Sequence, residues 1–329
     1  MSVQAVSASA PGRSNSRNPG FDLDLGWLRQ IRMNRSALER RAATIGTRRT
    51  VKKEWQAAWL LKAISLIDLT TLNSDDTAGR VERLCAKARH PVRSDILKAL
   101  GAEELHLTVA AVCVYHTFVK TAVDALKGSG IPVAAVSTAF PAGLAPHKTK
   151  LAEIEASVKD GAREIDIVIE RHKVLNGDWK GLYKEVRDYR AACGDAHLKT
   201  ILGTGDLATL TNVARASLVC MQAGADFIKT STGKEKVNAT LPVSLAMIRM
   251  IRWFHEETGI AIGYKPAGGI SSAKDALTYL ALIKDELGNA WLDPHLFRFG
   301  ASSLLTDIER QLEHAATGHY SADYRHPMA

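Results

Sequence analysis

The sequence predicts a (β/α)8 TIM barrel preceded by a helical extension. Eight short apolar runs, each rich in Val, Ile, Phe or Thr, recur from residue 64 onward, a pattern typical of buried parallel strands. Amphipathic segments of helical periodicity separate these runs. The repeating part covers about 250 residues, which is the usual size of such a barrel.

The strands are expected, in chain order, at residues 64–70, 107–115, 131–138, 164–169, 197–204, 226–232, 260–266 and 296–302. Several of the intervening helices are expected to end at a glycine just before the next strand, as at Gly161, Gly224 and Gly259. A doubly wound open sheet is the rival architecture. It often has a Gly-x-Gly-x-x-Gly turn after its first strand, and residues 71–80 contain no such turn. We therefore favour the barrel.

The chain outside the barrel differs in composition. Residues 1–20 are rich in Ser, Pro, Gly and Arg, which predicts a disordered arm. An organelle transit peptide stays open for this arm, because it contains no acidic residue. Residues 21–63 are expected to form the helical extension, residues 64–316 the barrel, and residues 317–329 a mobile tail.

Composition excludes several classes of function. No run of 18 apolar residues is present, and the N-terminus lacks the apolar stretch of a secretory signal, so we expect no membrane association. The four cysteines are scattered without metal-ligand spacing, which favours a reduced, cytoplasmic protein with no metal. The net charge of +8 would suit a phosphorylated metabolite or nucleic acid, but no nucleic-acid-binding motif accompanies it.

Polar residues inside or directly after the predicted strands are the candidates for chemistry, because catalytic groups of such barrels lie at the carboxyl ends of the strands. They are Asp68, Cys113, Asp166, Lys199, Lys229, Lys265, Ser302 and Ser303. Each has a structural alternative: Asp68 as a cap, Cys113 as a small core residue, and a strand lysine as a rim residue reaching solvent. Three lysines and two acids at matching strand positions favour a functional set.

A lysine in a dry site close to a second lysine has a lowered pKa. Its neutral amine can attack a carbonyl and form a Schiff base, while a nearby carboxylate moves protons. This is the logic of a class I aldolase, which requires no metal or other cofactor. Glycine-rich segments after the sixth, seventh and eighth strands, at 231–234, 265–272 and 298–303, add a candidate phosphate site with Ser302 or Ser303 as helix N-cap.

Eight motifs occur in order between about residue 50 and residue 316: LIDLTTL, AAVCVY, FPAG, EIDIVI, LKTILGTGDL, FIKTSTGK, GYKPAGGI and FRFGASSLL. Together they resemble the 2-deoxyribose-5-phosphate aldolases, in their longer eukaryote-type branch. The resemblance implies a class I lyase of deoxyribonucleoside catabolism. Such an enzyme reversibly cleaves 2-deoxy-D-ribose 5-phosphate to D-glyceraldehyde 3-phosphate and acetaldehyde.

The resemblance also implies roles for individual residues. Lys229 would form the Schiff base, Lys265 would lower its pKa, and Asp166 would relay protons. The residues implied to line the substrate pocket are Asp68, Thr71, Cys113 and Lys199. Those implied to bind the phosphate are Gly233, Lys234, Gly268, Gly269, Gly300, Ser302 and Ser303.

Some positions depart from the family pattern. Ser271 stands where an arginine is usual, which could weaken phosphate binding, while His116 replaces a proline and Ala139 a glycine. The family also uses a tyrosine in its tail, and either Tyr320 or Tyr324 could correspond. Two other functions stay open: a related carbon–carbon lyase with a different acceptor, and a binding or scaffold role for the basic arm. A homo-oligomer is compatible with all three.

Overall fold

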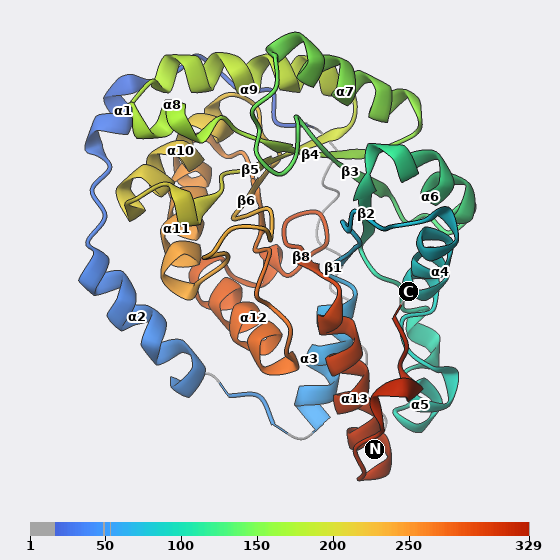
Figure 1. Cartoon of the computed structure of the whole chain (residues 1–329). Helices are drawn as coiled ribbons and strands as arrows, with labels where there is room; N and C mark the ends of the chain where they lie inside the picture. Colours follow the sequence, from blue (N-terminus) through green and yellow to red (C-terminus); the bar gives the residue numbers. More distant parts are fainter. Residues whose placement is uncertain (1–16, 49, 53, 329) are drawn as a thin grey trace.

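The computed structural model describes residues 17–48, 50–52 and 54–328 (Figure 1). Its parallel strands are β1 (Ile67–Thr70), β2 (Ala111–Tyr115), β3 (Val133–Ser137), β4 (Glu164–Val168), β5 (His197–Ile201), β6 (Phe227–Lys229), β7 (Gly263–Lys265) and β8 (Phe299–Ala301). They are ordered β7-β6-β5-β4-β3-β2-β1-β8. Two parallel bridges, Tyr264 to Phe297 and Ala267 to Gly300, connect the two ends of this order, at β7 and β8. The predicted barrel is therefore confirmed.

All eight strands lie within the predicted runs, and each is shorter than its run. The sixth run, 226–232, keeps only Phe227–Lys229 as strand, and the seventh, 260–266, keeps Gly263–Lys265. In the sixth run the residues outside the strand, 230–232, follow it, whereas in the seventh run residues 260–262 precede the strand. The backbone after β6 bonds irregularly to neighbouring loops, as in the hydrogen bond from Thr204 N to Thr230 O of 2.9 Å.

Helices surround the sheet (Figure 1). They are α4 (Ala78–Arg89), α5 (Ser94–Ala99), α6 (Val119–Ala125), α7 (His147–Lys159), α8 (Arg171–Leu175), α9 (Trp179–Cys193), α10 (Leu210–Gln222), α11 (Leu241–Thr258), α12 (Ala273–Leu287) and α13 (Ser303–Thr317). The expected glycine stops occur: Gly259 caps α11, and Gly161 and Gly224 follow the caps of α7 and α10, each with positive φ. Among the described residues, no helix combines the length and apolar character needed to cross a membrane.

In the part of the chain that the structure describes, three helices precede the barrel: α1 (Leu25–Gln30), α2 (Arg35–Arg48) and α3 (Glu54–Ile64). α2 packs on α11 and α12, and α3 packs on α12 and α13. Phe21 and Trp27 stack on Phe254 of α11, with ring centroids 5.7 and 5.9 Å away. The extension therefore covers one side of the helical layer.

Residues 1–16 of the expected disordered arm lie outside the described residues. Residues 17–20, which belong to the same expected arm, lie against the barrel instead. Asn18 is buried, and its Nδ2 donates to the carbonyl oxygens of Met221 and Ala225, both at 2.8 Å. Its backbone N–H donates to Asp226 Oδ1 at 2.7 Å. These hydrogen bonds hold a polar segment against the barrel, a contact that composition did not reveal.

Candidate active site

The centre of the barrel contains charged side chains that are almost completely withdrawn from solvent. Burying such charges is costly unless they are paired and hydrogen-bonded. The parallel register explains how they meet, because Asp166 of β4 is aligned with Lys199 of β5, and Lys229 of β6 is aligned with Lys265 of β7. The buried set is Asp68, Glu164, Asp166, Lys199, Lys229, Lys265 and Arg298.

Lys229 and Lys265 converge on one carboxylate oxygen. The Nζ atom of each lies 2.8 Å from Asp166 Oδ2. The other oxygen, Asp166 Oδ1, accepts from Lys199 Nζ at 3.1 Å. Asp166 thus contacts all three strand lysines that the sequence analysis selected.

The two lysines on Asp166 Oδ2 differ in pKa. Burial lowers the pKa of Lys229, and the positive charge of Lys265 lowers it further, against the opposing effect of Asp166. Burial also disfavours the charge on Lys265, but the carboxylates of Asp166 and Asp68 outweigh it and raise the pKa of Lys265. For Asp166, burial is outweighed by its three lysine partners, which hold its pKa well below the usual range. The site therefore favours a neutral amine beside a charged ammonium.

Arg298 and Glu164 complete this buried network, and sequence analysis missed both. Arg298 Nη1 donates to Asp68 Oδ1 at 2.5 Å, and Arg298 Nη2 donates to Glu164 Oε1 at 2.8 Å. Asp68 Oδ2 in turn accepts from Lys265 Nζ at 2.5 Å. A signal was present: Glu164 lies two residues before Asp166 and so shares its face of the strand, and Arg298 interrupts an apolar run.

Lys199 closes the network into a ring, because its Nζ donates both to Glu164 Oε2 and to Asp166 Oδ1. Among the described residues, the ring and Lys229 together hold four cationic side chains and three carboxylates. With every group ionised the cluster carries one excess positive charge. Loss of the Lys229 proton removes this excess charge, in agreement with the lowered pKa of Lys229.

A cavity of about 240 Å³ opens above Lys229. Seventeen residues line it, and every implied phosphate-binding residue is among them: Gly233, Lys234, Gly268, Gly269, Gly300, Ser302 and Ser303. Thr71 lines it as well, whereas Asp68, Cys113 and Lys199 lie fully buried and are not part of the lining. The structure therefore brings the amine and the glycine-rich loops to one cavity.

The loops are shaped to present backbone N–H groups. Gly233, Gly268 and Gly269 all have positive φ, at 87°, 79° and 80°, a region that side chains disfavour. Ser302 occupies the N-cap position of α13 as expected, but its side chain makes no capping hydrogen bond. The first turn of α13 can therefore donate its N–H groups to an anion.

Comparison with known proteins identifies the family. Residues 62–309 match the family model described as DeoC/LacD family aldolase. The chain is 58% identical over 317 residues to a human deoxyribose-phosphate aldolase, covering 96% of this chain and 100% of that protein. It is 59% identical over 312 residues to the mouse deoxyribose-phosphate aldolase, covering 94% of this chain and 98% of that one. The chain belongs to the DeoC/LacD aldolase family.

The fold of this DeoC/LacD family member recurs in solved structures. A deoxyribose phosphate aldolase from Aeropyrum pernix, described as tetrameric, matches with a TM-score of 0.59 at 22% identity, over 88% of this chain and all of that one. An aldolase called QR15 matches with a TM-score of 0.58 at 25% identity, over 77% of this chain and 96% of that one. Both have the barrel described above.

The residues that depart from the family pattern have distinct environments. Ser271 lines the cavity, and so do the two lysines Lys229 and Lys234. Ala139 has a φ of 60°, a backbone conformation that glycine adopts more readily than alanine. His116 Nδ1 lies 3.1 Å from Ser157 Oγ of α7.

Cys113 is a small core residue, which was the structural alternative given for it in the sequence analysis. It packs with Leu72, Ala134 and Val136 in a small apolar cluster that Tyr115 borders. Burial raises the pKa of the thiol. A protonated thiol in this position is a weak nucleophile.

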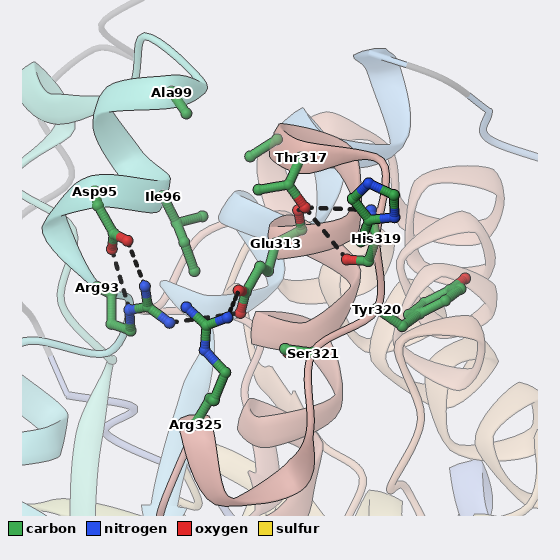
Figure 2. A pocket seen from close by; sticks show the side chains of 11 residues that line it. Arg93, Asp95, Ile96, Ala99, Glu313, Thr317, His319, Tyr320, Ser321 and Arg325 are labelled. Atoms are coloured by element: carbon green, nitrogen blue, oxygen red, sulfur yellow. Dashed lines mark hydrogen bonds and ion pairs between the residues drawn. The ribbon is translucent and has the colours of Figure 1, made fainter.

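The candidate tail tyrosines of this aldolase lie away from the cavity. Tyr320 stacks on His314 of α13 with ring centroids 4.2 Å apart, and Tyr324 is 83% exposed. Tyr320 lines a different cavity, of about 250 Å³, between α5, α13 and the tail (Figure 2). The tail is attached there through His326, which is buried and whose Nε2 lies 2.7 Å from Glu313 Oε2.

Proposed function

We propose that this chain is a deoxyribose-phosphate aldolase that works through a Schiff base on Lys229. It reversibly cleaves 2-deoxy-D-ribose 5-phosphate to D-glyceraldehyde 3-phosphate and acetaldehyde, a reaction of deoxyribonucleoside catabolism. The observation that carries the proposal is the shared contact of Lys229 and Lys265 with Asp166 Oδ2, at 2.8 Å each, beside a cavity lined by glycine-rich loops. The close similarity to the mammalian aldolases supports the same substrate.

The first step requires a neutral amine. Lys229 Nζ attacks the C1 aldehyde of the open-chain sugar, and loss of water from the carbinolamine leaves a protonated imine. Asp166 Oδ2 is within hydrogen-bonding distance of this nitrogen and accepts or returns the protons that the step moves. The charged Lys265 on the same oxygen supplies the proton for departure of the water.

The second step breaks the bond between C2 and C3. The 3-hydroxyl group gives its proton to the Asp166 carboxylate, its oxygen becomes the aldehyde of glyceraldehyde 3-phosphate, and the bonding electrons flow through C2 into the imine. The resulting enamine takes a proton at C2 and is hydrolysed to acetaldehyde and free Lys229. The iminium nitrogen serves as the electron sink throughout.

The phosphate group fits the other end of the cavity. The N–H groups of the Gly233 and Gly268–Gly269 turns and of the first turn of α13 are the donors that we assign to it, together with the Lys234 ammonium. Helix N-termini and glycine turns are favourable for phosphate. Lys199 and Asp68 are assigned as supports of Asp166 and Lys265 from beneath, since both are fully buried.

We place this activity in the cytoplasm, because all four cysteines are free thiols, as is usual in a reducing compartment. A homo-oligomer is part of the proposal, and the tetrameric relative from Aeropyrum pernix supports it. A phosphorylated sugar is the partner that we propose for the cavity.

Trapping the Schiff base tests the proposal. Incubation with acetaldehyde and borohydride should add a reduced two-carbon group to Lys229, identified by peptide mass spectrometry, and Lys229→Ala should abolish both the adduct and cleavage of 2-deoxyribose 5-phosphate. Lys184→Ala, on the exposed surface of α9, is the matched control. An unmodified Lys229, or full activity of Lys229→Ala, would show that the mechanism is wrong.

A further inference from the structure

Arg171, the first residue of α8 after β4, contacts the three loops that follow β3, β5 and β6. Its Nη1 donates to Ala142 O and its Nη2 to Pro141 O, both at 3.3 Å, after β3. Its Nε lies 3.3 Å from Asp206 Oδ2, after β5. Its Nη2 also donates to Glu235 Oε1 at 2.9 Å, after β6. One guanidinium therefore fixes the relative positions of these loops.

Glu235 connects Arg171 to the turn beside the cavity. Its carboxylate accepts from Thr232 N at 3.0 and 3.1 Å and from Thr232 Oγ1 at 2.7 Å. Thr232 Oγ1 in turn accepts from Lys234 N at 3.1 Å. Burial disfavours the charge on Glu235, but the Thr232 hydrogen bonds and Arg171 outweigh it and lower its pKa. The ionised carboxylate thus holds the turn that contains Gly233.

The segment after the turn is packed tightly on both sides. A Cβ atom at Gly205 would lie 2.1 Å from Val237 O, and one at Gly268 would lie 2.6 Å from Asn238 Cγ. Neither position leaves room for a side chain, so the segment fills the space between the β5 loop and the β7 loop. Its conformation thereby determines how the Gly233 turn faces Gly268 across the cavity.

We propose that Arg171 and Glu235 form a clasp that positions the Thr232–Lys234 turn for the substrate phosphate. The clasp would then set the preference for phosphorylated over unphosphorylated substrates, an inference that rests on the proposed function. Neither side chain is among the described residues that line the cavity. Both are positioning residues, and they act on the phosphate end of the substrate rather than on the carbon that reacts with Lys229.

Two substrates separate this role from a general structural one. In Arg171→Met and Glu235→Gln, kcat/KM for 2-deoxyribose 5-phosphate should fall about tenfold, mainly through KM, while kcat/KM for 2-deoxyribose stays within about twofold. Arg171→Lys, which keeps a cation near Glu235, should recover part of the loss. Lys120→Met removes the exposed Lys120–Asp124 pair and is the control. An equal loss on both substrates, or no loss, would overturn the clasp.

Binding of inorganic phosphate gives a readout that needs no turnover. Titration calorimetry on the full chain should show about tenfold weaker phosphate binding in Arg171→Met and Glu235→Gln than in the unaltered protein and Lys120→Met. If the unaltered protein binds phosphate but cleaves neither sugar, the proposed function fails and the clasp is judged by this affinity alone. Equal phosphate affinity in all four proteins, or no phosphate binding in the unaltered one, would overturn the clasp.

Discussion

The Nζ atoms of Lys229 and Lys265 lie 2.8 Å from the same oxygen, Asp166 Oδ2. Two ammonium groups on one oxygen repel each other, and the cost is removed when one of them loses its proton. Lys265 has a second carboxylate partner in Asp68, whereas the described ion pair of Lys229 is with Asp166 alone. The asymmetry selects Lys229 as the lysine that becomes neutral.

Lys265→Met should shift the pH dependence of the Lys229 amine. The substitution removes a positive charge that lowers the pKa of Lys229, so this pKa should rise toward the ordinary 10.5 and Schiff-base formation should require higher pH. Borohydride trapping with acetaldehyde across a pH series, followed by mass spectrometry, measures this shift. Lys184→Met should leave the profile in place, and an acid limb that stays or moves to lower pH in Lys265→Met would contradict the prediction.

Asp166→Asn should separate amine reactivity from proton transfer. The amide cannot accept and return protons as the carboxylate does, so kcat for cleavage of 2-deoxyribose 5-phosphate should fall by about 10²–10⁴-fold. The pKa of Lys229 should fall further, because the carboxylate that raises it is gone, and adduct formation with acetaldehyde at fixed neutral pH should persist. A kcat within tenfold of the unaltered enzyme would exclude Asp166 as the proton carrier.

Arg298→Leu should destabilise the protein by about 3–5 kcal/mol at pH 7, because it leaves Asp68 and Glu164 buried with one partner fewer. Burial raises the pKa of both carboxyls, and the cations around them, Arg298 first, lower it below the ordinary 3.8 and 4.5. The stability that they contribute is therefore complete above these values and is lost as the pH falls through the lowered ones.

Urea unfolding at pH 7 and pH 3 measures this difference. The difference in unfolding free energy between Arg298→Leu and the unaltered protein should be larger at pH 7 than at pH 3. Lys120→Met, which removes an exposed pair, should change the unfolding free energy by less than about 1 kcal/mol. A difference that is constant with pH would mean that packing of the arginine, and not its charge, carries the effect.

Ser271→Arg should strengthen phosphate recognition. Ser271 lines the cavity beside Gly269 and Ile270, and an arginine there could donate two hydrogen bonds to a phosphate. We expect KM for 2-deoxyribose 5-phosphate to fall about tenfold with little change for 2-deoxyribose. Ser271→Gln, which adds length without charge, is the control. If KM in Ser271→Arg fell equally for both substrates, the arginine would not be acting on the phosphate.

Tyr320→Phe and Tyr324→Phe should each keep activity within about twofold. Both tyrosines are exposed, and neither lines the cavity beside Lys229 among its described lining residues. Steady-state cleavage of 2-deoxyribose 5-phosphate measures this. A loss of kcat in one variant alone would assign that tyrosine to catalysis and would require the tail to leave its contacts with α13 during turnover.

The sequence alone determined the strands, the turns and the candidate lysines of this protein, through side-chain chemistry and short-range pattern. The eight apolar runs predicted eight strands, because buried parallel strands need continuous apolar residues. A lysine inside such a run is conspicuous for the same reason, which is how Lys199, Lys229 and Lys265 were found. The glycine-rich segments predicted tight turns, since few other residues adopt positive φ.

Only the tertiary structure decided which of these groups meet. The register of β6 and β7 sets Lys229 beside Lys265, and closure of the barrel brings Arg298 of the last strand region to Asp68 of the first. Arg171 and Glu235 are separated by 64 residues along the chain. Such contacts depend on strand order and barrel closure, which no local spacing encodes, whereas strand and turn preferences are properties of neighbouring residues.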